Sequence, residues 1–257
     1  MHPIVFQVGN LVVYSHGLLA AVGILIGSFF IGWLAKRHGL KLREYWDMIL
    51  YSILAGLVGA RLGYVILYYH EFSRFREIFY IWQGGLVSYT GLIFGFGMAA
   101  WWLYLKKQKI APWLDVGILG VLLGWGIARI GCFLAGDLIG KVTESRLGII
   151  FPTIDFLPRF PVALFEAVGV FLLFGILIYL FQKKTTFPGL IFILGVAGYA
   201  LIRFGVDFWR IYSFGPQPAL NLSQIFSLIV LVISIIILIY LKRKVGNGSK
   251  IYPRKKS

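Results

Sequence analysis

Seven long apolar runs, separated by short polar segments, dominate the pattern of hydrophobic and polar positions along the chain. At 1.5 Å per residue, about 20 residues cross a hydrocarbon layer about 30 Å thick, and every run reaches that length. The pattern therefore predicts an all-α polytopic membrane protein with seven transmembrane helices. Since no internal repeat is visible, we expect a single membrane domain over residues 1–241. The predicted spans are 14–35, 47–69, 84–105, 112–135, 162–181, 187–209 and 222–241.

Basic residues cluster directly after the first, third, fifth and seventh runs. By the positive-inside rule, this alternation predicts an N-terminus outside and a C-terminus in the cytoplasm. Residues 242–257 then form a basic cytoplasmic tail, which we expect to be disordered and attracted to anionic lipid. The formal net charge of +15 lies mostly in these clusters. We therefore predict the membrane bilayer, and no nucleic acid, as the partner of this charge.

The composition agrees with a membrane protein. A hydrophobic fraction of 59%, a charged fraction of 14% and a mean hydropathy of +0.84 exclude a soluble domain of this size. Cys132 is the one cysteine, which excludes an intramolecular disulfide and a multi-cysteine metal site. The first ten residues contain no Lys or Arg, so they lack the basic region of a cleavable signal peptide, and we expect the first span to be retained.

Two segments on the predicted outer side are longer than simple connectors. Segment 70–83 has aromatic and charged residues at helical spacing, which favours an interfacial amphipathic arm over an ordinary polar loop. Segment 136–161 contains glycines, three prolines and mixed charges, which predicts an irregular extracytoplasmic loop.

Three arginines lie inside predicted spans. Arg61, Arg129 and Arg203 occur in the second, fourth and sixth spans, which run in the same direction. Each lies roughly six to eight residues before the outer end of its span, or about 9 to 12 Å below the membrane boundary. A charge inside a span costs about 3 kcal/mol or more, so it indicates a functional site. Three cations at one depth repel one another, so we expect an anion there.

Two acidic residues, Glu166 and Asp207, lie near these arginines in the predicted topology. One interpretation is structural, with Arg129 paired to Glu166 and Arg203 paired to Asp207. The other is that the arginines, with Arg210 added, exceed the acids and bind an external anion. A guanidinium group presents a planar fork that matches phosphate oxygens. At this depth the phosphate would belong to a phospholipid head group, and we favour this second interpretation.

Side chains that could move a proton lie near the same depth. Tyr89 lies near the outer end of the third span, and His16 begins the first span. His16 is either an ordinary interfacial side chain or a proton carrier level with the arginines, and both interpretations stay open. One face of the sixth span carries, at positions i, i+4, i+8 and i+11, Tyr199, Arg203, Asp207 and Arg210.

Five collinear segments carry a resemblance to a known family. They are ARIGCFLAGDLIG (128–140), GARLGYVILYY (59–69), PRFPVALFEA (158–167), YALIRFGVDFWR (199–210) and NLSQIFSL (221–228). Together they resemble the prolipoprotein diacylglyceryl transferases of the bacterial plasma membrane, and they extend over nearly the whole chain. The first segment is similar to the family signature GRxGNFxNxExxG.

The chain departs from the family pattern at several positions. The His-Gly-Gly motif of the third span is Tyr-Thr-Gly at 89–91, and His16 stands where the family often has a tyrosine. The two residue types therefore look exchanged between two helix ends. The two asparagines of the signature are Cys132 and Ala135 here.

The resemblance implies transfer of a diacylglyceryl group from phosphatidylglycerol to the lipobox cysteine of a prolipoprotein signal peptide, with release of glycerol phosphate. It implies no metal or other cofactor, and it places the protein in the bacterial plasma (inner) membrane. The catalytic residues would be His16, Tyr89, Arg129, Tyr199 and Arg203. The residues binding the phospholipid would be Arg61, Arg129, Asp137, Gly140, Glu166, Arg203 and Arg210.

Two other functions stay open at this point. A lipid or anion transporter would also place arginines inside spans, although it would be expected to show repeats and sites near the membrane midplane. A divergent family member with a changed acceptor, or without activity, is the other alternative, because the histidine and the asparagines differ.

Overall fold

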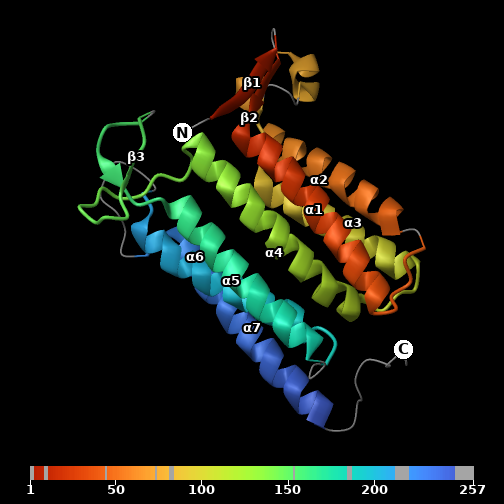
Figure 1. Cartoon of the computed structure of the whole chain (residues 1–257). Coiled ribbons are helices and arrows are strands. Elements are labelled where there is room, and N and C mark those ends of the chain that lie inside the picture. The colour runs from red at the N-terminus through yellow and green to blue at the C-terminus, as the bar shows by residue number, and fades with distance from the viewer. Residues whose placement is uncertain are drawn as a thin grey trace. The chain divides into compact units, whose positions relative to one another are not determined.

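The computed structural model describes residues 3–8, 11–43, 45–72, 74–80, 84–152, 154–183, 187–211 and 220–246. Helices dominate these residues, and each predicted span overlaps one of them (Figure 1). Six of the described helices are long and apolar enough to cross a membrane, whereas the apolar part of the third, Thr90–Leu105, is shorter. The helical, multi-span class is therefore confirmed, while crossing by all seven helices and the orientation stay predictions. The helices are α1 (Ser15–Arg37), α2 (Tyr45–Leu67), α3 (Ser88–Leu105), α4 (Ile110–Ala135), α5 (Val162–Gln182), α6 (Leu190–Val206) and α7 (Leu222–Gly246).

Within the described part of the chain, two small antiparallel sheets accompany the helices, and neither was predicted. Strands β1 (Ile4–Val8) and β2 (Leu11–Tyr14) form a hairpin that leads directly into α1. Strands β3 (Ile149–Ile150) and β4 (Pro158–Arg159) pair within the segment that follows α4. Isoleucine and valine are frequent in three of the four strands, and such β-branched residues favour the pleated conformation.

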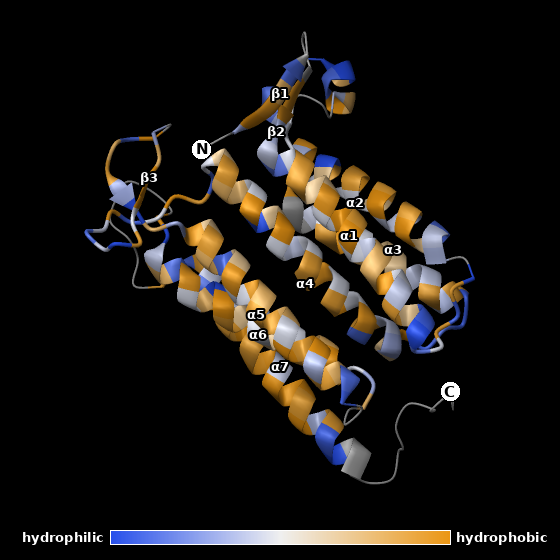
Figure 2. Ribbon diagram, viewed as in Figure 1, coloured by the Kyte–Doolittle hydropathy of each residue, from blue (hydrophilic) through white to orange (hydrophobic). Residues whose placement is uncertain are grey.

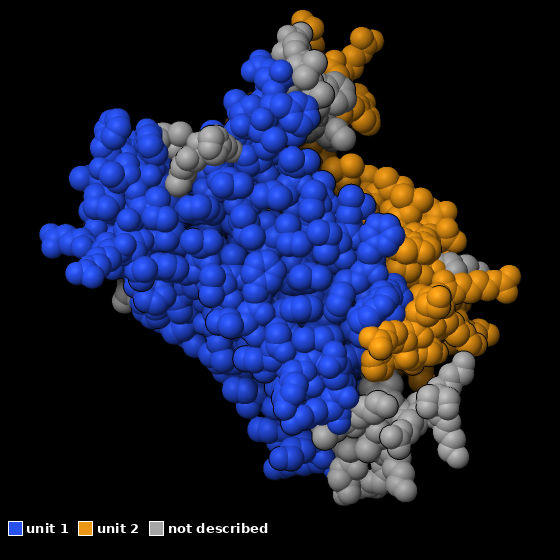
Figure 3. All heavy atoms as spheres, viewed as in Figure 1, with its two compact units in different colours: residues 1–34, 114–257 blue, residues 35–113 orange. Residues whose placement is uncertain are grey.

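The chain divides into two compact units (Figure 3). Unit 1 comprises residues 1–34 and 114–257, and unit 2 comprises residues 35–113. Unit 1 contains most of α1 and α4, all of α5 to α7, and both small sheets; unit 2 contains α2 and α3. The single membrane domain inferred from the sequence stays a prediction.

Glycines set the packing of α1 against α4 in unit 1. A Cβ atom added to Gly23 would lie 2.3 Å from the carbonyl oxygen of Gly124, and one added to Gly27 would lie 2.6 Å from that of Gly120. Small residues let helix backbones approach closely in membranes, where hydrophobic driving force between helices is absent. Helix α5 packs on α6, and α6 packs on α7.

A buried carboxylate caps the start of α6. Asp115 of α4 is fully buried and accepts hydrogen bonds from the backbone N–H groups of Gly189 at 2.7 Å and Phe192 at 2.9 Å. The first N–H groups of a helix have no partner within the helix, so a carboxylate there is favourable. This contact ties α4 to α6.

Large apolar side chains cover the outward surfaces of the helices in unit 1. Figure 2 shows apolar positions along α5 and α7, with hydrophilic positions gathered near helix ends. Exposed examples are Phe29 of α1, Leu172 of α5 and Ile236 of α7. Such continuous apolar surface is too extensive for a soluble protein and is typical of helices that face lipid.

The segment after α4 is held against the end of α6. The backbone N–H of Lys141 donates to the carbonyl of Trp209 at 2.8 Å, and that of Ile211 donates to Ile139 at 3.0 Å. Hydrogen bonds from Arg159 hold the pKa of Asp155 below its usual value.

At the other end of the chain, α7 continues to Gly246, five residues beyond the predicted span, and the rest of the predicted tail lies outside the described residues.

In unit 2, Arg61 organises the segment between α2 and α3. The described part of this segment forms two short 3-10 helices, Tyr69–Glu71 and Phe75–Phe79, rather than one continuous helix. The buried Arg61 guanidinium donates to the carbonyls of Glu77 and Ile78 at 2.7 Å and to that of Gly84 at 2.7 Å. The end of the predicted arm, residues 81–83, lies outside the described residues, and its interfacial position stays a prediction.

Candidate active site

A buried carboxylate, Glu166, lies at the centre of a charged cluster in unit 1. Its Oε1 accepts hydrogen bonds from the Tyr199 hydroxyl at 2.9 Å and from the Trp125 indole at 3.3 Å. Its Oε2 accepts from Nη1 of Arg203 at 2.9 Å, and Nε of Arg129 lies 3.0 Å from Oε1. The side chain of Glu166 is 0% exposed, so these partners replace all of its hydration. Helices α4, α5 and α6 thus meet at one carboxylate.

Arg203 uses its guanidinium to join three helical segments. Besides Glu166 of α5, it contacts Oδ1 of Asp207 at 3.3 Å and donates from Nε to the Ser223 hydroxyl of α7 at 3.1 Å. Asp207 begins a short 3-10 helix, Asp207–Trp209, that continues α6, so the i, i+4 spacing seen in the sequence brings the pair together.

Arg129 is held less completely than Arg203. Its Nε is close to Glu166 but is not aligned for a hydrogen bond, and its Nη1 lies 3.6 Å from the sulfur of Cys132. The guanidinium also lies over the Trp125 ring, 4.6 Å from its centroid. Since sulfur is a weak acceptor, a phosphate oxygen would be a stronger partner for this guanidinium.

Both ion pairs that the sequence offered as a purely structural explanation of the arginines are present. Arg129 pairs with Glu166 and Arg203 pairs with Asp207, while the additional Arg203–Glu166 contact joins the two pairs. Two arginines and two carboxylates balance in this cluster. The surplus of positive charge expected from the sequence would therefore have to come from Arg61 and Arg210, and it stays a prediction.

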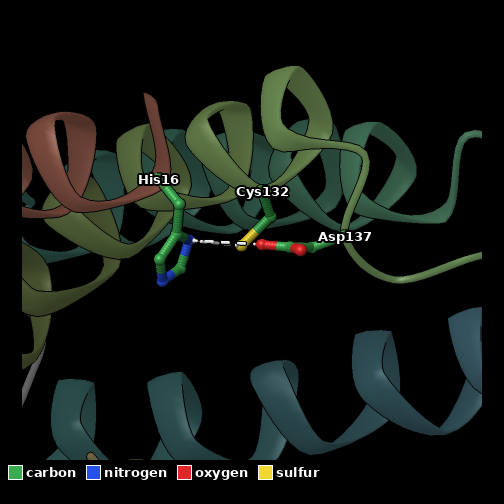
Figure 4. A group of neighbouring side chains, drawn as sticks. All are labelled: His16, Cys132 and Asp137. Atoms are coloured by element: carbon green, nitrogen blue, oxygen red, sulfur yellow. Dashed lines mark hydrogen bonds and ion pairs between the residues drawn. The ribbon is translucent and has the colours of Figure 1, made fainter. Parts of the chain in front are cut away.

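A second group of side chains lies beside Arg129. The Cys132 sulfur is 3.3 Å from Nδ1 of His16, and the same nitrogen is 3.9 Å from Oδ2 of Asp137 (Figure 4). Cys132 is buried, whereas the side chains of His16 and Asp137 are 51% and 55% exposed. Because Cys132 touches both His16 and Arg129, it connects this exposed group to the buried cluster.

A glycine allows the approach of α4 to the start of α1. A Cβ atom on Gly131 would lie 2.9 Å from Leu19 Cβ and 3.2 Å from the Cα of His16. Cys132 departs from the family pattern, but its contact with His16 was not predicted from the sequence. The sequence did contain a signal for this contact. Cys132 and His16 both depart from the family pattern, and both lie near helix ends that were predicted to be at the same depth.

The remaining predicted site residues lie outside both the Glu166 cluster and the group formed by His16, Cys132 and Asp137. Gly140 is buried, packs against the Phe160 carbonyl and forms an antiparallel bridge with Arg210. Arg61 belongs to unit 2, where it binds backbone carbonyls. Tyr89 also belongs to unit 2, and its side chain lies outside the described residues. Contacts of these residues with a substrate stay predictions.

These features define a multi-pass helical membrane protein with a charged site near the ends of α4 and α6, coupled to a cysteine–histidine contact. The family model described as prolipoprotein diacylglyceryl transferase matches residues 3–240, so the chain belongs to this family.

Curated relatives align with this chain over nearly their whole length. One from Clostridium tetani is 31% identical over 92% of this chain and 96% of its own. One from Legionella pneumophila strain Philadelphia 1 is 33% identical over 91% and 95%, and one from Francisella tularensis subsp. holarctica is 30% identical over 93% and 92%. All three are named phosphatidylglycerol–prolipoprotein diacylglyceryl transferase.

Proposed function

We propose that this protein transfers a diacylglyceryl group from phosphatidylglycerol to the lipobox cysteine of prolipoproteins. The observation that carries this function is the family match over residues 3–240, in a chain whose arginines and carboxylates gather at a buried site. The relatives carry the name of this transferase, and no observation favours a transporter or an inactive member.

In the reaction, the thiol sulfur of the acceptor attacks the glyceryl carbon that carries the phosphate ester. A C–S bond forms, the C–O bond breaks, and the electron pair leaves with glycerol phosphate. The thiol loses its proton to a base, and the departing phosphate gains negative charge. The site must therefore hold a phosphate, stabilise its added charge and accept one proton.

Arg129 and Arg203 are the groups that hold the phosphate in this proposal. Supporting evidence is their shared attachment to Glu166, which sets the two guanidinium groups beside each other and leaves Arg129 with a weak sulfur contact. Tyr199 and Glu166 orient them through the hydrogen bonds around the carboxylate. Asp137, Gly140, Arg210 and Arg61 would shape the lipid-binding surroundings.

His16 is the base in this proposal, with Tyr89 as the alternative. The imidazole is half-exposed, and its Nδ1 is engaged by Cys132, so the other ring nitrogen would be the one that accepts the thiol proton. If His16→Phe transfers lipid at the normal rate, this role goes to another group.

The protein would act as a multi-pass protein of the bacterial plasma (inner) membrane. We propose seven crossings, with α3 as the third, the N-terminus outside and the C-terminus in the cytoplasm. The basic clusters after alternate spans support this orientation. The site would then open toward the outer leaflet, where secreted precursors arrive.

The test is transfer of lipid to a lipobox peptide in vesicles of phosphatidylglycerol, followed by mass spectrometry of the peptide. We expect the unaltered protein to add one diacylglyceryl group, and Arg129→Ala and Arg203→Ala to lower the rate by at least about 100-fold, as for loss of a group that stabilises developing charge. Arg146→Ala, an exposed arginine of the outer loop, is the matched control. An unmodified peptide with the unaltered protein would contradict the function; near-normal rates in both variants would contradict only the phosphate-binding roles.

A further inference from the structure

Three different metal-ligating side chains converge where α1 begins and α4 ends. The Nδ1 of His16, the sulfur of Cys132 and a carboxylate oxygen of Asp137 all lie within 4.8 Å of one another (Figure 4). Imidazole nitrogen, thiolate sulfur and carboxylate oxygen are the donor types that zinc takes in proteins.

The separations of these atoms fit a tetrahedral ion with little adjustment. Zn–S, Zn–N and Zn–O bonds of about 2.3, 2.05 and 2.1 Å at tetrahedral angles require separations of about 3.6 Å for sulfur to nitrogen and about 3.4 Å for nitrogen to oxygen. The observed separations are 3.3 Å between Cys132 and His16, and 3.9 Å between His16 and Asp137. Shifts of a few tenths of an ångström, within reach of side-chain rotation, would meet both values.

The end of α4 places Asp137 beside Cys132. Gly136 has a φ of +79°, and its N–H donates to the Phe133 carbonyl at 3.2 Å, while the N–H of Asp137 donates to the Cys132 carbonyl at 2.9 Å. This pair of bonds is the Schellman arrangement, which ends a helix on a left-handed glycine. Two of the three ligands are thus fixed by one helix terminus, and the third comes from α1.

The local charge permits a cation in spite of the neighbouring arginine. Arg129 lies 3.6 Å from the Cys132 sulfur, but its charge is compensated by Glu166 at 3.0 Å. A thiolate and the Asp137 carboxylate together supply two negative charges, which match one divalent ion. The exposure of His16 and Asp137 leaves a fourth position open for a further ligand such as a water molecule.

We propose that His16, Cys132 and Asp137 form a binding site for a thiophilic divalent cation of the zinc class. Binding releases the thiol proton of Cys132 to water, and the thiolate, the imidazole and the carboxylate each contribute one ligand atom. The proposal goes beyond the transfer reaction, because neither the family match nor the proposed phosphate-binding arginines require a metal, and it shares His16 and Asp137 with the proposed transfer site.

Cobalt(II) is the probe that tests this site, because a thiolate ligand gives it a charge-transfer absorption in the near ultraviolet. The full chain, purified in detergent without an oligohistidine tag, is titrated with cobalt and then with zinc. We expect one cobalt per chain with the thiolate band, and displacement of cobalt by zinc. Cys132→Ser removes a ligand itself, so it should weaken binding by at least about 100-fold, the upper end of the loss seen for outer-shell changes.

His16→Asn and Asp137→Asn complete the test, with His70→Asn as the matched control because His70 is exposed and belongs to unit 2. Asp137 is exposed, so its replacement leaves folding intact. Binding that weakens in both site variants and persists in the control supports the proposal. Absence of the thiolate band, or equal cobalt affinity with and without Cys132, would overturn it. Since metal binding is measured without the transfer assay, failure of this proposal and failure of the proposed function are separate results.

Discussion

Glu166 is the side chain on which the charged cluster depends. Removing a carboxylate from water costs several kcal/mol unless charged partners and hydrogen bonds replace its hydration. Here Arg129, Arg203, Tyr199 and Trp125 supply those partners from two neighbouring helices. The same contacts fix both guanidinium groups, so the stability of the cluster and its proposed chemistry both depend on Glu166.

Replacing Glu166 with glutamine should therefore destabilise the protein as well as stop transfer. The two arginines would lose a shared counter-charge while staying buried, and breaking such a buried pair costs about 3–5 kcal/mol. We expect a lower midpoint of thermal unfolding in detergent for Glu166→Gln. Glu144→Gln, at an exposed loop position, is the control and should unfold at the midpoint of the unaltered protein. Equal midpoints for the two variants would mean that Glu166 is not the counter-charge of this cluster.

The ion pair of Asp155 with Arg159 predicts a dependence of the outer loop on pH. Because the pKa of Asp155 is lowered in the folded loop by hydrogen bonds from Arg159, the pair stabilises the loop fully above pH about 4, the usual aspartate pKa. The contribution is lost as the pH falls further, through the lowered pKa. The Leu157 amide, which donates to Asp155 at 3.2 Å, reports this change by hydrogen exchange corrected for intrinsic rates. In Asp155→Asn the protection should be weaker at neutral pH and should no longer change over this range.

At the residue level, the sequence predicted two ion pairs of the charged cluster, one within a single helical segment and one between two helices. Arg203 and Asp207 meet as their i, i+4 spacing indicated, and Arg129 meets Glu166 as one interpretation proposed. The Cys132–His16 contact was not predicted, because it depends on how α1 and α4 are aligned. That alignment is set by backbone contacts between glycines, which hydropathy does not encode.

Among the elements, the helices were predictable and the short strands were not. A span of about 20 apolar residues has one stable conformation in lipid, because its backbone groups must bond within the segment. The hairpin β1–β2 and the pair β3–β4 have few residues each, and their pairing depends on turns and on neighbouring segments. The 3-10 helices after α2 were predicted as an amphipathic arm, and their form depends on the carbonyls bound by Arg61.

Helix α1 allows a matched test of close packing. Gly23→Ala would set a methyl group 2.3 Å from the Gly124 carbonyl oxygen, so the two helices would have to separate, at a cost of about 1–3 kcal/mol. Gly17→Ala, on the same helix, meets nothing within 4 Å and gains helix propensity. We expect thermal unfolding in detergent at a lower temperature for the first variant and at an unchanged or higher temperature for the second. A Gly23→Ala protein as stable as Gly17→Ala would contradict the close approach.

For the whole molecule, orientation is the prediction with the widest consequence. Helix α3 has 18 residues, which span about 27 Å, close to the thickness of the hydrocarbon layer. If it crosses, Lys107 lies in the cytoplasm and the loop around Ser145 lies outside. We expect alkaline phosphatase, which is active only outside, to be active when fused after Ser145 and inactive after Lys107. Green fluorescent protein at the C-terminus should fluoresce. Phosphatase activity at Lys107 would contradict the crossing of α3.

The cap that Asp115 makes on α6 has a geometric consequence for the distant arginines. Fourteen residues separate Asp115 from Arg129 on α4, and fourteen separate Gly189 from Arg203 on α6. Both stretches measure about 21 Å, so two contacts at equal spacing connect α4 and α6: Asp115 with the start of α6, and Glu166 with the two arginines. A shift of either helix along its axis by one turn, about 5.4 Å, would break both contacts at once. A carboxylate about 20 Å away thus helps to set the height at which the two guanidinium groups meet.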